Sequence, residues 1–280
     1  MNAKVIARRA GWSILATVII VCVGFVIWFK VNETSLIYRT LPDNISQADS
    51  LLLKCEKVTI QSEGAVLICW LYPADRPDSE KTWILFFPGN GDYDATDVAR
   101  CKILHDLGPN ILAVRYRGYG SSTGRPSEAG LHADATASYN YLKTVKGAAP
   151  ANIVVYGHSM GTWIAIDLAS RLPVAGVAVE GANESLAVGA ATKYPFLPWK
   201  LLLHDRYDCM EKIGGIAAPK IFIHATDDQS IPISHGRALF AKATEPKTFL
   251  EIHGGHVLAP MVDRERYIAG MTQFLHSLPR

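Results

Sequence analysis

NIVVYGHSMGTWIAI, residues 152–166, contains a strand, a tight turn and the start of a helix in sequence alone. Its first five residues read as a β-strand, and a helix is expected to begin around Thr162. Between them, Gly157-His158-Ser159-Met160-Gly161 follows the G-x-S-x-G pattern of a sharp turn that exposes a serine hydroxyl. Such a turn needs small neighbours because the helix must approach the strand closely. Ser159 is therefore a candidate nucleophile, although an ordinary strand-to-helix loop is the alternative.

Short apolar runs alternate with helical stretches around this turn. The alternation predicts an α/β fold with a mostly parallel, doubly wound sheet covered on both faces, and an antiparallel hairpin that turns at Gly64 on its leading edge. Residues 183–212 break the rhythm and predict a small helical insertion over the carboxyl edge of the sheet, where open α/β sheets bind ligands. The expected strands are 54–60, 65–72, 82–87, 110–116, 152–156, 174–181, 220–225 and 247–252, and the expected helices are 94–107, 126–145, 162–172, 233–243 and 261–277.

An acid is expected after the strand at 220–225. The segment HATDDQSIP (224–232) carries two aspartates there, and a carboxylate at this place can orient a histidine and stabilise its cationic form. Asp228 is the better candidate because it lies four residues before the proline of a D-x-x-I-P string. Asp227 is then a loop residue or a helix cap, a common role of loop aspartates.

A base is expected after the strand at 247–252. His256 lies in HGGHVL (253–258), where a histidine in a flexible, glycine-bounded loop can swing between serine and aspartate and work near neutral pH. His253 is the alternative, but at the end of the strand it can simply face solvent. The two histidines have no third ligand at a suitable spacing, so no metal site is expected.

Ser159, Asp228 and His256 follow one another in the order nucleophile, acid, base. This is the order of the α/β-hydrolase fold and of neither major serine-protease fold. Three matches after three expected strands are much harder to obtain by accident than one.

An acyl-transfer reaction also needs two backbone N–H donors for its oxyanion. One is expected at Met160, the residue after the nucleophile, and the other at Asn90 in PGNGD (88–92). Gly89 and Gly91 allow the main chain to come close to a substrate oxygen. A plain glycine-rich turn is the alternative for this loop, and it is not a phosphate loop because no Gly-Lys-Ser/Thr follows.

Four segments resemble successive blocks of the membrane-anchored α/β-hydrolase-domain proteins related to yeast bud-emergence protein, a group that includes protein depalmitoylases. They are PGNGD, VRYRGYGSSTGRPSEAGLHADATASYNYL, VVYGHSMGTWIAIDLA and HATDDQSIP, and RYRGYGSSTG is the most specific part. The resemblance covers residues 54–277. Many relatives carry a single N-terminal anchor, and Arg115–Gly120 is expected to be a structural loop near the active site. Pro88 and Ala225 replace the usual histidine and glycine, which affects the expected substrate preference.

The run from Gly11 to Phe29, GWSILATVIIVCVGFVIWF, contains 19 residues and no charge. At the helical rise it spans roughly 28 Å, enough to cross the core of a bilayer. Lys4, Arg8 and Arg9 precede it, so the N-terminus is expected to be cytoplasmic and the remaining chain extracytoplasmic, on the periplasmic or lumenal side. A cleaved signal peptide and a buried core helix are the alternatives, but IWFKVNE offers no small-x-small cleavage site.

The 280 residues carry a formal net charge of only +2, which argues against a nucleic-acid partner. The expected organisation is a membrane anchor at 1–30, a linker at 31–53 and a hydrolase domain at 54–280. Cys55 and Cys69 fall nearly opposite each other on the hairpin strands, so either a disulfide or buried free thiols are expected there.

Together these features predict a membrane-anchored serine hydrolase that cleaves acyl or lipid-type esters or thioesters through an acyl-enzyme, without a cofactor. The insertion is expected to form an apolar lid for an acyl chain, although the same residues could simply pack on the sheet. An amidase with the same residues and a non-catalytic, membrane-tethered binding protein are the alternative functions. The expected substrate-binding residues are Tyr194, Phe196, Leu197 and Trp199.

Overall fold

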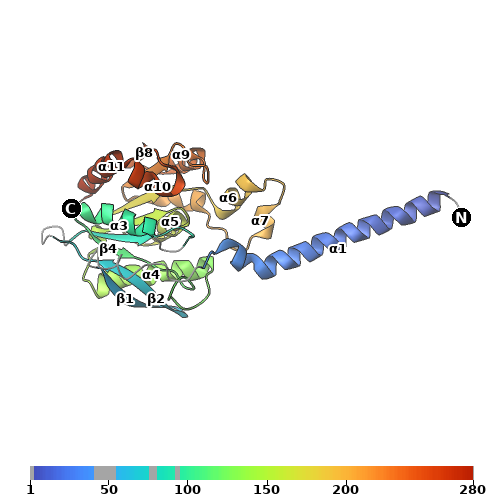
Figure 1. Ribbon diagram of the computed structural model, residues 1–280, viewed down its shortest axis with the longest axis horizontal. Helices are drawn as coiled ribbons and strands as arrows, with labels where there is room; N and C mark the ends of the chain where they lie inside the picture. Colours follow the sequence, from blue (N-terminus) through green and yellow to red (C-terminus); the bar gives the residue numbers. More distant parts are fainter. Residues whose placement is uncertain (1–2, 41–54, 76–80, 92–94, 280) are drawn as a thin grey trace.

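The computed structural model describes residues 3–40, 55–75, 81–91 and 95–279 (Figure 1). Residues 41–53 of the expected linker, and Asp92 of the PGNGD loop, lie outside these ranges. A layered α/β body holds most of the chain, and one long helix extends away from it.

Eight strands form one sheet in the order β1-β2-β4-β3-β5-β6-β7-β8. The first two strands pair antiparallel, β2 is also antiparallel to β4, and all the other pairs are parallel. This confirms the α/β-hydrolase fold and its leading hairpin. The strands are β1 Glu56–Ser62, β2 Ala65–Tyr72, β3 Trp83–Phe87, β4 Asn110–Ala113, β5 Ile153–His158, β6 Gly176–Glu180, β7 Lys220–Ala225 and β8 Lys247–Ile252.

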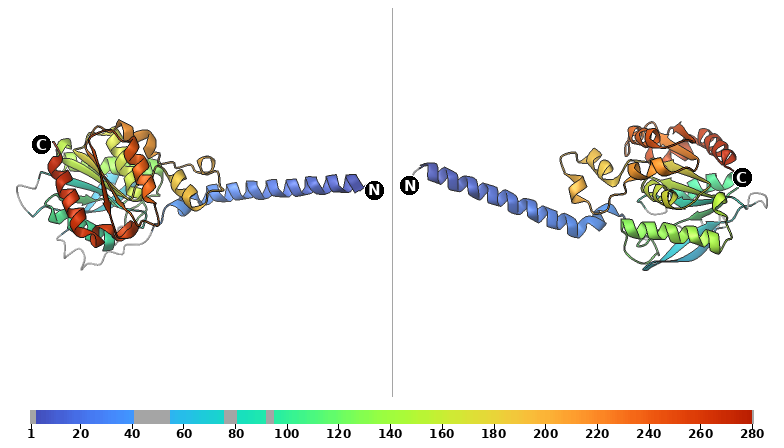
Figure 2. Two further views of the ribbon diagram at one scale, coloured as in Figure 1. Left: turned by 90° about the horizontal axis from the view of Figure 1, so that it is seen from above. Right: turned by 180° about the vertical axis from the view of Figure 1, so that it is seen from behind.

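Helices cover both faces of the sheet (Figure 2). Apolar side chains of α4, α5 and α9 pack on one face, and those of α3, α10 and α11 pack on the other. Strands β3 and β5 are buried along their whole length, as expected for the central strands of a parallel sheet. The helices are α3 Ala95–Asp106, α4 Glu128–Thr144, α5 Met160–Arg171, α9 Ile233–Lys242, α10 Gly255–Val262 and α11 Arg264–Ser277.

Strand β4 is shorter than the expected strand at 110–116. Beyond Ala113, the neighbouring strand β2 is hydrogen-bonded to a loop in place of β4. Ile68 N donates to Ser122 Oγ (2.9 Å), and Val66 N donates to Thr123 Oγ1 (2.8 Å). The hydroxyl side chains of the RGYGSSTG segment thus replace the strand that the apolar pattern suggested.

The cross-strand disulfide is not present. Cys69 lies opposite Val58 in the hairpin register, so it does not face Cys55, and both are free cysteines. Cys69 is fully buried, which raises the pKa of its thiol to about 12. The alternative expectation of free thiols is therefore the one that the structure supports.

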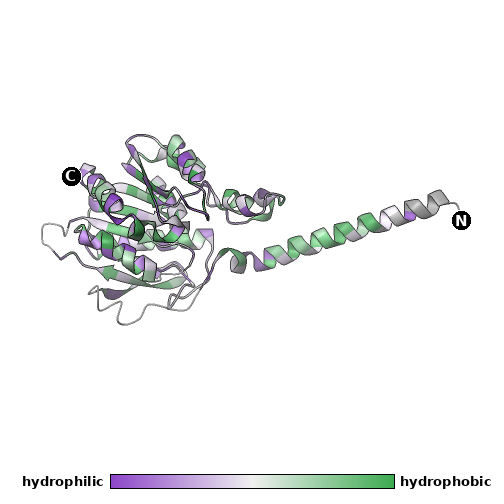
Figure 3. Cartoon of the chain, turned by 45° about the horizontal axis from the view of Figure 1, so that its top comes forward, coloured by the Kyte–Doolittle hydropathy of each residue, from purple (hydrophilic) through white to green (hydrophobic). Residues whose placement is uncertain are grey.

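Helix α1 (Ala3–Ile37) is continuous and extends past residue 30. Its part from Gly11 to Ile37 is long and apolar enough to cross a membrane, by length and composition (Figure 3). Only 6% of its most apolar window is buried. The insertion at 183–212 is helical as expected, with α6 (Leu186–Lys193), α7 (Trp199–Leu202) and α8 (Cys209–Lys212).

Candidate active site

Ser159 lies in the sharp turn between β5 and α5 with a φ of 52°, in the left-handed region that side chains rarely adopt. The two flanking glycines are required by close packing. A Cβ on Gly157 would lie 2.3 Å from the carbonyl oxygen of Gly161, and a Cβ on Gly161 would lie 2.0 Å from that of Phe87. The G-x-S-x-G segment therefore has the geometry that the sequence predicts, with the serine at the start of a helix.

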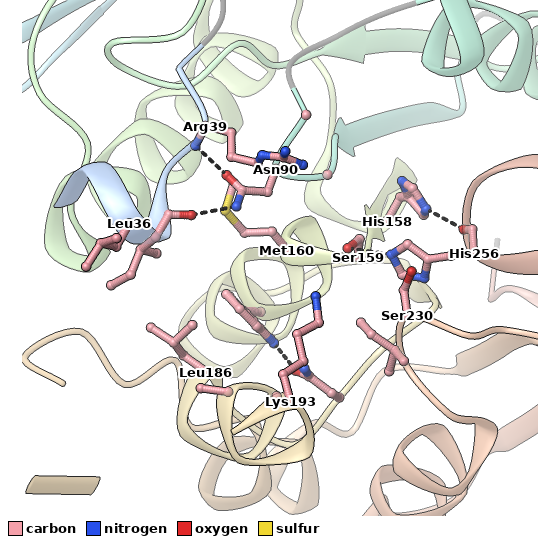
Figure 4. Close-up of a pocket in the computed structure, with 18 of the residues that line it drawn as sticks. Leu36, Arg39, Asn90, His158, Ser159, Met160, Leu186, Lys193, Ser230 and His256 are labelled. Carbon is pink, nitrogen blue, oxygen red and sulfur yellow. Dashed lines mark hydrogen bonds between the residues drawn. The ribbon is translucent and has the colours of Figure 1, made fainter. Parts of the chain in front are cut away.

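His256 lies between Ser159 and Asp228. Its Nε2 is 2.8 Å from Ser159 Oγ, which lies beside it (Figure 4). Its Nδ1 is 2.7 Å from Asp228 Oδ2. A carboxylate only accepts, so Nδ1 carries the proton and Nε2 is left to accept from the serine hydroxyl. In sequence, Ser159 lies 97 positions before His256, and Asp228 lies 28 positions before it. The fold brings these three predicted residues together in a hydrogen-bonded chain.

Asp228 is held as an anion. Burial opposes its charge, but the hydrogen bond with His256 and the backbone amides of Ser230 (2.7 Å) and Ile231 (2.8 Å) outweigh burial and lower the pKa of the carboxyl group. The carboxylate is therefore ionised near neutral pH and able to stabilise a cationic imidazole.

Asp227 and His253, the alternatives in the sequence, have other contacts. The Asp227 carboxylate accepts from the amides of Gly254 (3.1 Å) and Gly255 (3.0 Å), where α10 begins. His253 is exposed, and its Nδ1 lies 2.8 Å from Thr226 Oγ1. Asp227 thus has the capping role considered for it. His256 lies in the first turn of a helix, and the flexible loop expected around it is not observed, because Asp227 binds the free amides at the helix start.

A buried polar network, which the sequence patterns did not reveal, supports the backbone of the His256 segment. His158 Nε2 donates to the carbonyl oxygen of His256 (3.0 Å), and Arg100 Nη2 donates to that of Val257 (2.9 Å). Burial, followed by the nearby charge of Arg100, lowers the pKa of His158 well below its usual range, so it stays a neutral donor. Arg100 also forms a bidentate pair with Glu180, at 2.9 and 3.0 Å.

The two expected oxyanion donors lie beside Ser159. Met160 is the first residue of α5, so its amide has no acceptor within the helix. The loop that contains Asn90 is also close to the serine, since a Cβ built on Gly89 would lie 3.4 Å from Ser159 Cβ. The Asn90 side chain is bound to the end of α1: its Nδ2 donates to Ile37 O (2.6 Å), and its Oδ1 accepts from Arg39 N (3.0 Å) (Figure 4).

The Arg115–Gly120 loop supports the Asn90 loop through two tyrosine hydroxyls. Tyr116 Oη donates to Pro88 O (2.8 Å), and Tyr119 Oη donates to Asn90 Oδ1 (2.7 Å). Both tyrosines are buried, and their rings contact each other edge to face. The expectation of a structural loop near the site is confirmed by these contacts.

A pocket of about 790 Å³ opens over Ser159 and His256. Tyr194 and Trp199 of the insertion line it, as expected. Leu197 packs beside Trp199 in a small apolar cluster, while Phe196 is 79% exposed, and neither is among the described residues that line the pocket. The end of α1 forms another wall that the sequence did not suggest. Its lining residues are Phe29, Leu36, Ile37 and Arg39.

Comparisons with known proteins agree with this geometry. The family model described as the Alpha/beta hydrolase family matches residues 84–212. An uncharacterised protein of Mycobacterium tuberculosis is 31% identical over 270 residues, which are 96% of each chain. Alpha/beta hydrolase domain-containing protein 17B of Homo sapiens is 34% identical over 205 residues, covering 71% of this chain and 68% of that protein.

The chain belongs to the α/β-hydrolase family. Among solved structures, the hydrolase is similar to the esterase Pf2001 of Pyrococcus furiosus, with a TM-score of 0.70 at 18% identity over 86% of this chain and 98% of the esterase. It is also similar to an alpha-beta hydrolase of Vibrio vulnificus, with a TM-score of 0.65 at 25% identity over 83% of this chain and 85% of the other.

Proposed function

We propose that the chain is a membrane-anchored serine hydrolase that cleaves carboxylic esters or thioesters with an apolar acyl group. The observation that carries the proposal is the hydrogen-bonded chain from Ser159 through His256 to Asp228 at the base of the pocket. Membership of the α/β-hydrolase family, and the resemblance to a group that includes protein depalmitoylases, support an acyl substrate.

Acylation begins when His256 Nε2 takes the proton of the Ser159 hydroxyl and Oγ attacks the carbonyl carbon of the substrate. The carbonyl oxygen becomes an oxyanion, which accepts hydrogen bonds from the amides of Met160 and Asn90. The imidazolium, stabilised by Asp228, then gives its proton to the leaving alcohol or thiol as the bond to that group breaks. The acyl group remains on Ser159 as an ester.

Deacylation repeats these steps with water. His256 removes a proton from water, the hydroxide attacks the acyl carbon, and the second oxyanion uses the same two amides. When the oxyanion collapses, Ser159 Oγ leaves and is protonated by His256. The products are a carboxylic acid and the free enzyme.

Membrane anchoring is the second part of the proposal. The charge-free run at 11–29 and the low burial of α1 support a membrane span. The basic residues before the span favour a cytoplasmic N-terminus with the hydrolase domain on the extracytoplasmic side. A protease-protection assay on sealed vesicles tests this orientation, and a C-terminus accessible only from the cytoplasmic side would overturn it.

Turnover of p-nitrophenyl acyl esters tests the proposed reaction, with the matching p-nitroanilides as amide substrates. We expect hydrolysis of the esters, weak or no hydrolysis of the anilides, and loss of turnover in the Ser159→Ala variant. Faster cleavage of the anilides would favour an amidase. No turnover of either, with folded protein, would favour a binding protein instead.

The apolar walls also predict a preference for acyl length. Tyr194 and Trp199 from the insertion, with Phe29 from α1, offer apolar surface to a chain that extends from Ser159. A series of p-nitrophenyl esters from acetate to long-chain acyl groups should therefore show kcat/KM that rises with chain length. Equal values across the series would remove the role of the lid in binding an acyl chain.

A further inference from the structure

The end of α1 is packed against the insertion. Phe29 is only 5% exposed, and its ring centroid lies 5.9 Å from that of Trp199 in α7. Leu202 and Leu203 are the other buried members of this small apolar cluster. A hydrogen bond from His204 N to Glu33 and one from Tyr38 Oη to Asp205 extend the contact beyond the cluster. The insertion is therefore fixed to the last turns of the anchor helix.

This contact sets the depth of the insertion relative to a bilayer. Phe29 is the last residue of the charge-free run, Trp28 before it is exposed, and Lys30 after it is charged and exposed. A tryptophan followed by a lysine at the end of an apolar span is typical of the membrane interface. Because Trp199 contacts Phe29, the α7 end of the insertion lies at the level of the lipid headgroups.

The insertion presents large apolar side chains to the outside at this same level. Leu201 is 82% exposed, although its neighbours Leu202 and Leu203 are buried, and Phe196 is 79% exposed. Tyr194 is 53% exposed. Helices α6 and α7 extend from the α/β body on the side from which α1 leaves it (Figures 1 and 2). Exposed apolar groups gathered beside a span are typical of a membrane contact.

The charge of the insertion fits anionic headgroups. Between Ser185 and His204 the sequence contains two lysines, Lys193 and Lys200, both exposed, and no Asp or Glu. The acids that flank this segment in sequence have partners within the protein: Glu184 lies 2.6 Å from His235 Nδ1, and Asp205 accepts from Tyr38 Oη. Lysines beside an anionic membrane surface are attracted to it, so both side chains favour contact with acidic lipids.

We propose that the α6–α7 tip, defined by Lys193, Tyr194, Phe196, Lys200 and Leu201, docks into the headgroup region of the bilayer beside α1. Lys193 and Tyr194 also line the pocket, so this docking turns the pocket toward the membrane surface. The inference rests on the membrane anchoring proposed above and is independent of the hydrolytic reaction. Continuity with the span selects the bilayer over a soluble partner as the occupant.

Fluorescence quenching by lipids tests this docking in the full chain. The chain, with Cys22 and Cys55 replaced by alanine, is reconstituted in vesicles of phosphatidylcholine and phosphatidylglycerol that contain spin-labelled lipids. A fluorophore is attached to one introduced cysteine at a time: Pro195→Cys at the tip, Ile20→Cys in the span, or Val145→Cys just beyond the C-terminal end of α4. Position 195 is exposed and leaves the three apolar side chains in place.

We expect quenching at position 195 by lipids labelled near the headgroup, quenching at position 20 by lipids labelled deep in the acyl chain, and none at position 145. Quenching at 20 with none at 195 would overturn the docking and leave the anchor intact. No quenching at 20 would overturn the anchor and the docking together. Neither outcome bears on the hydrolytic reaction, which has its own assay.

The Lys200→Glu variant tests the charge argument. Relative to the unsubstituted tip, we expect it to reduce the quenching at position 195 several-fold in phosphatidylglycerol vesicles, and less in pure phosphatidylcholine. Equal quenching with and without the Lys200→Glu substitution, in both kinds of vesicle, would overturn the role of charge. Protection of the label at 195 that depends on protein concentration in detergent would identify a second copy as the occupant and overturn the bilayer proposal.

Discussion

At the scale of single residues, Ser159 keeps a strained backbone because both of its main-chain groups are hydrogen-bonded. Its amide donates to Glu180 O (2.8 Å), and its carbonyl oxygen accepts from the amide and the hydroxyl of Thr162 (3.0 and 2.6 Å). A residue in such a conformation costs on the order of 1–3 kcal/mol, and it persists only where its surroundings determine it. Here β6 and the first turn of α5 hold the hydroxyl toward His256.

The two adjacent aspartates provide a matched pair of variants. In Asp228→Asn the side-chain oxygen is kept by the amides of Ser230 and Ile231, so an NH2 donor faces His256 Nδ1. The imidazole loses its tautomer and its counterion, and kcat should fall by about 10³–10⁴-fold. Asp227→Asn leaves the His256 hydrogen bond in place and weakens only the start of α10, so kcat should fall by about 10-fold at most. Steady-state kinetics on one ester measures both. A larger loss in Asp227→Asn would mean that the acid is assigned to the wrong residue.

At the scale of elements, the Asn90 loop is held by segments far from it in sequence. Its side chain is bonded to Ile37 O and Arg39 N at the end of α1 and to Tyr119 Oη in the loop after β4. Helix α1 therefore contributes to the position of an expected oxyanion donor as well as to a wall of the pocket. The hydrogen bonds of Asn90 with the end of α1 and with Tyr119 could not be predicted from the sequence, because they join distant segments.

Asn90→Ala tests this link because it keeps the backbone amide and removes every side-chain contact. An oxyanion donor contributes about 10²–10³-fold to the rate, so a displaced one should lower kcat by about 10-fold or more with little change in KM. Tyr119→Phe is the matched control, since it removes one contact, worth about 1 kcal/mol, and should lower kcat by about 5-fold or less. An unchanged kcat in Asn90→Ala would show that the contacts with α1 do not affect the reaction.

Local patterns were enough to predict the strands and the order nucleophile, acid, base along the chain. They were also enough to predict the three residues that the fold joins in one hydrogen-bonded chain. They could not predict α10, because Asp227, which binds its first amides, lies 27 and 28 positions away from them. The network of His158 and Arg100 was missed for the same reason. Arg100 lies 80 positions from Glu180 and 157 from Val257, and only the folded sheet brings them together.

For the molecule as a whole, stability should depend on His132, a partly buried histidine that is neutral in the folded state. Burial lowers the pKa of His132 to about 4, although Asp167 lies 3.6 Å from its Nδ1, with Lys212 and Arg171 bound to the same carboxylate. An unfolded histidine binds a proton below about pH 6.5. Between pH 6.5 and 4 the unfolded chain therefore binds more protons than the folded one, and the free energy of unfolding falls as pH is lowered.

His132→Gln should reduce this pH dependence. Urea unfolding at several pH values between 7 and 4 measures the slope, which should decrease by up to one proton in the variant. His276→Gln, at the exposed end of α11, is the control and should leave the slope unchanged. The same reduction in both variants would mean that the slope has another origin than the burial of His132.

Helix α1, the insertion and the α/β body meet at the pocket over Ser159, and the proposed reaction depends on Ser159 being the nucleophile. The most direct measurement is labelling of the folded full chain with a fluorophosphonate probe, followed by mass spectrometry of the modified peptide. We expect one adduct, on Ser159, and none in the Ser159→Ala variant. An unlabelled wild-type chain, or an adduct on a different residue, would contradict it.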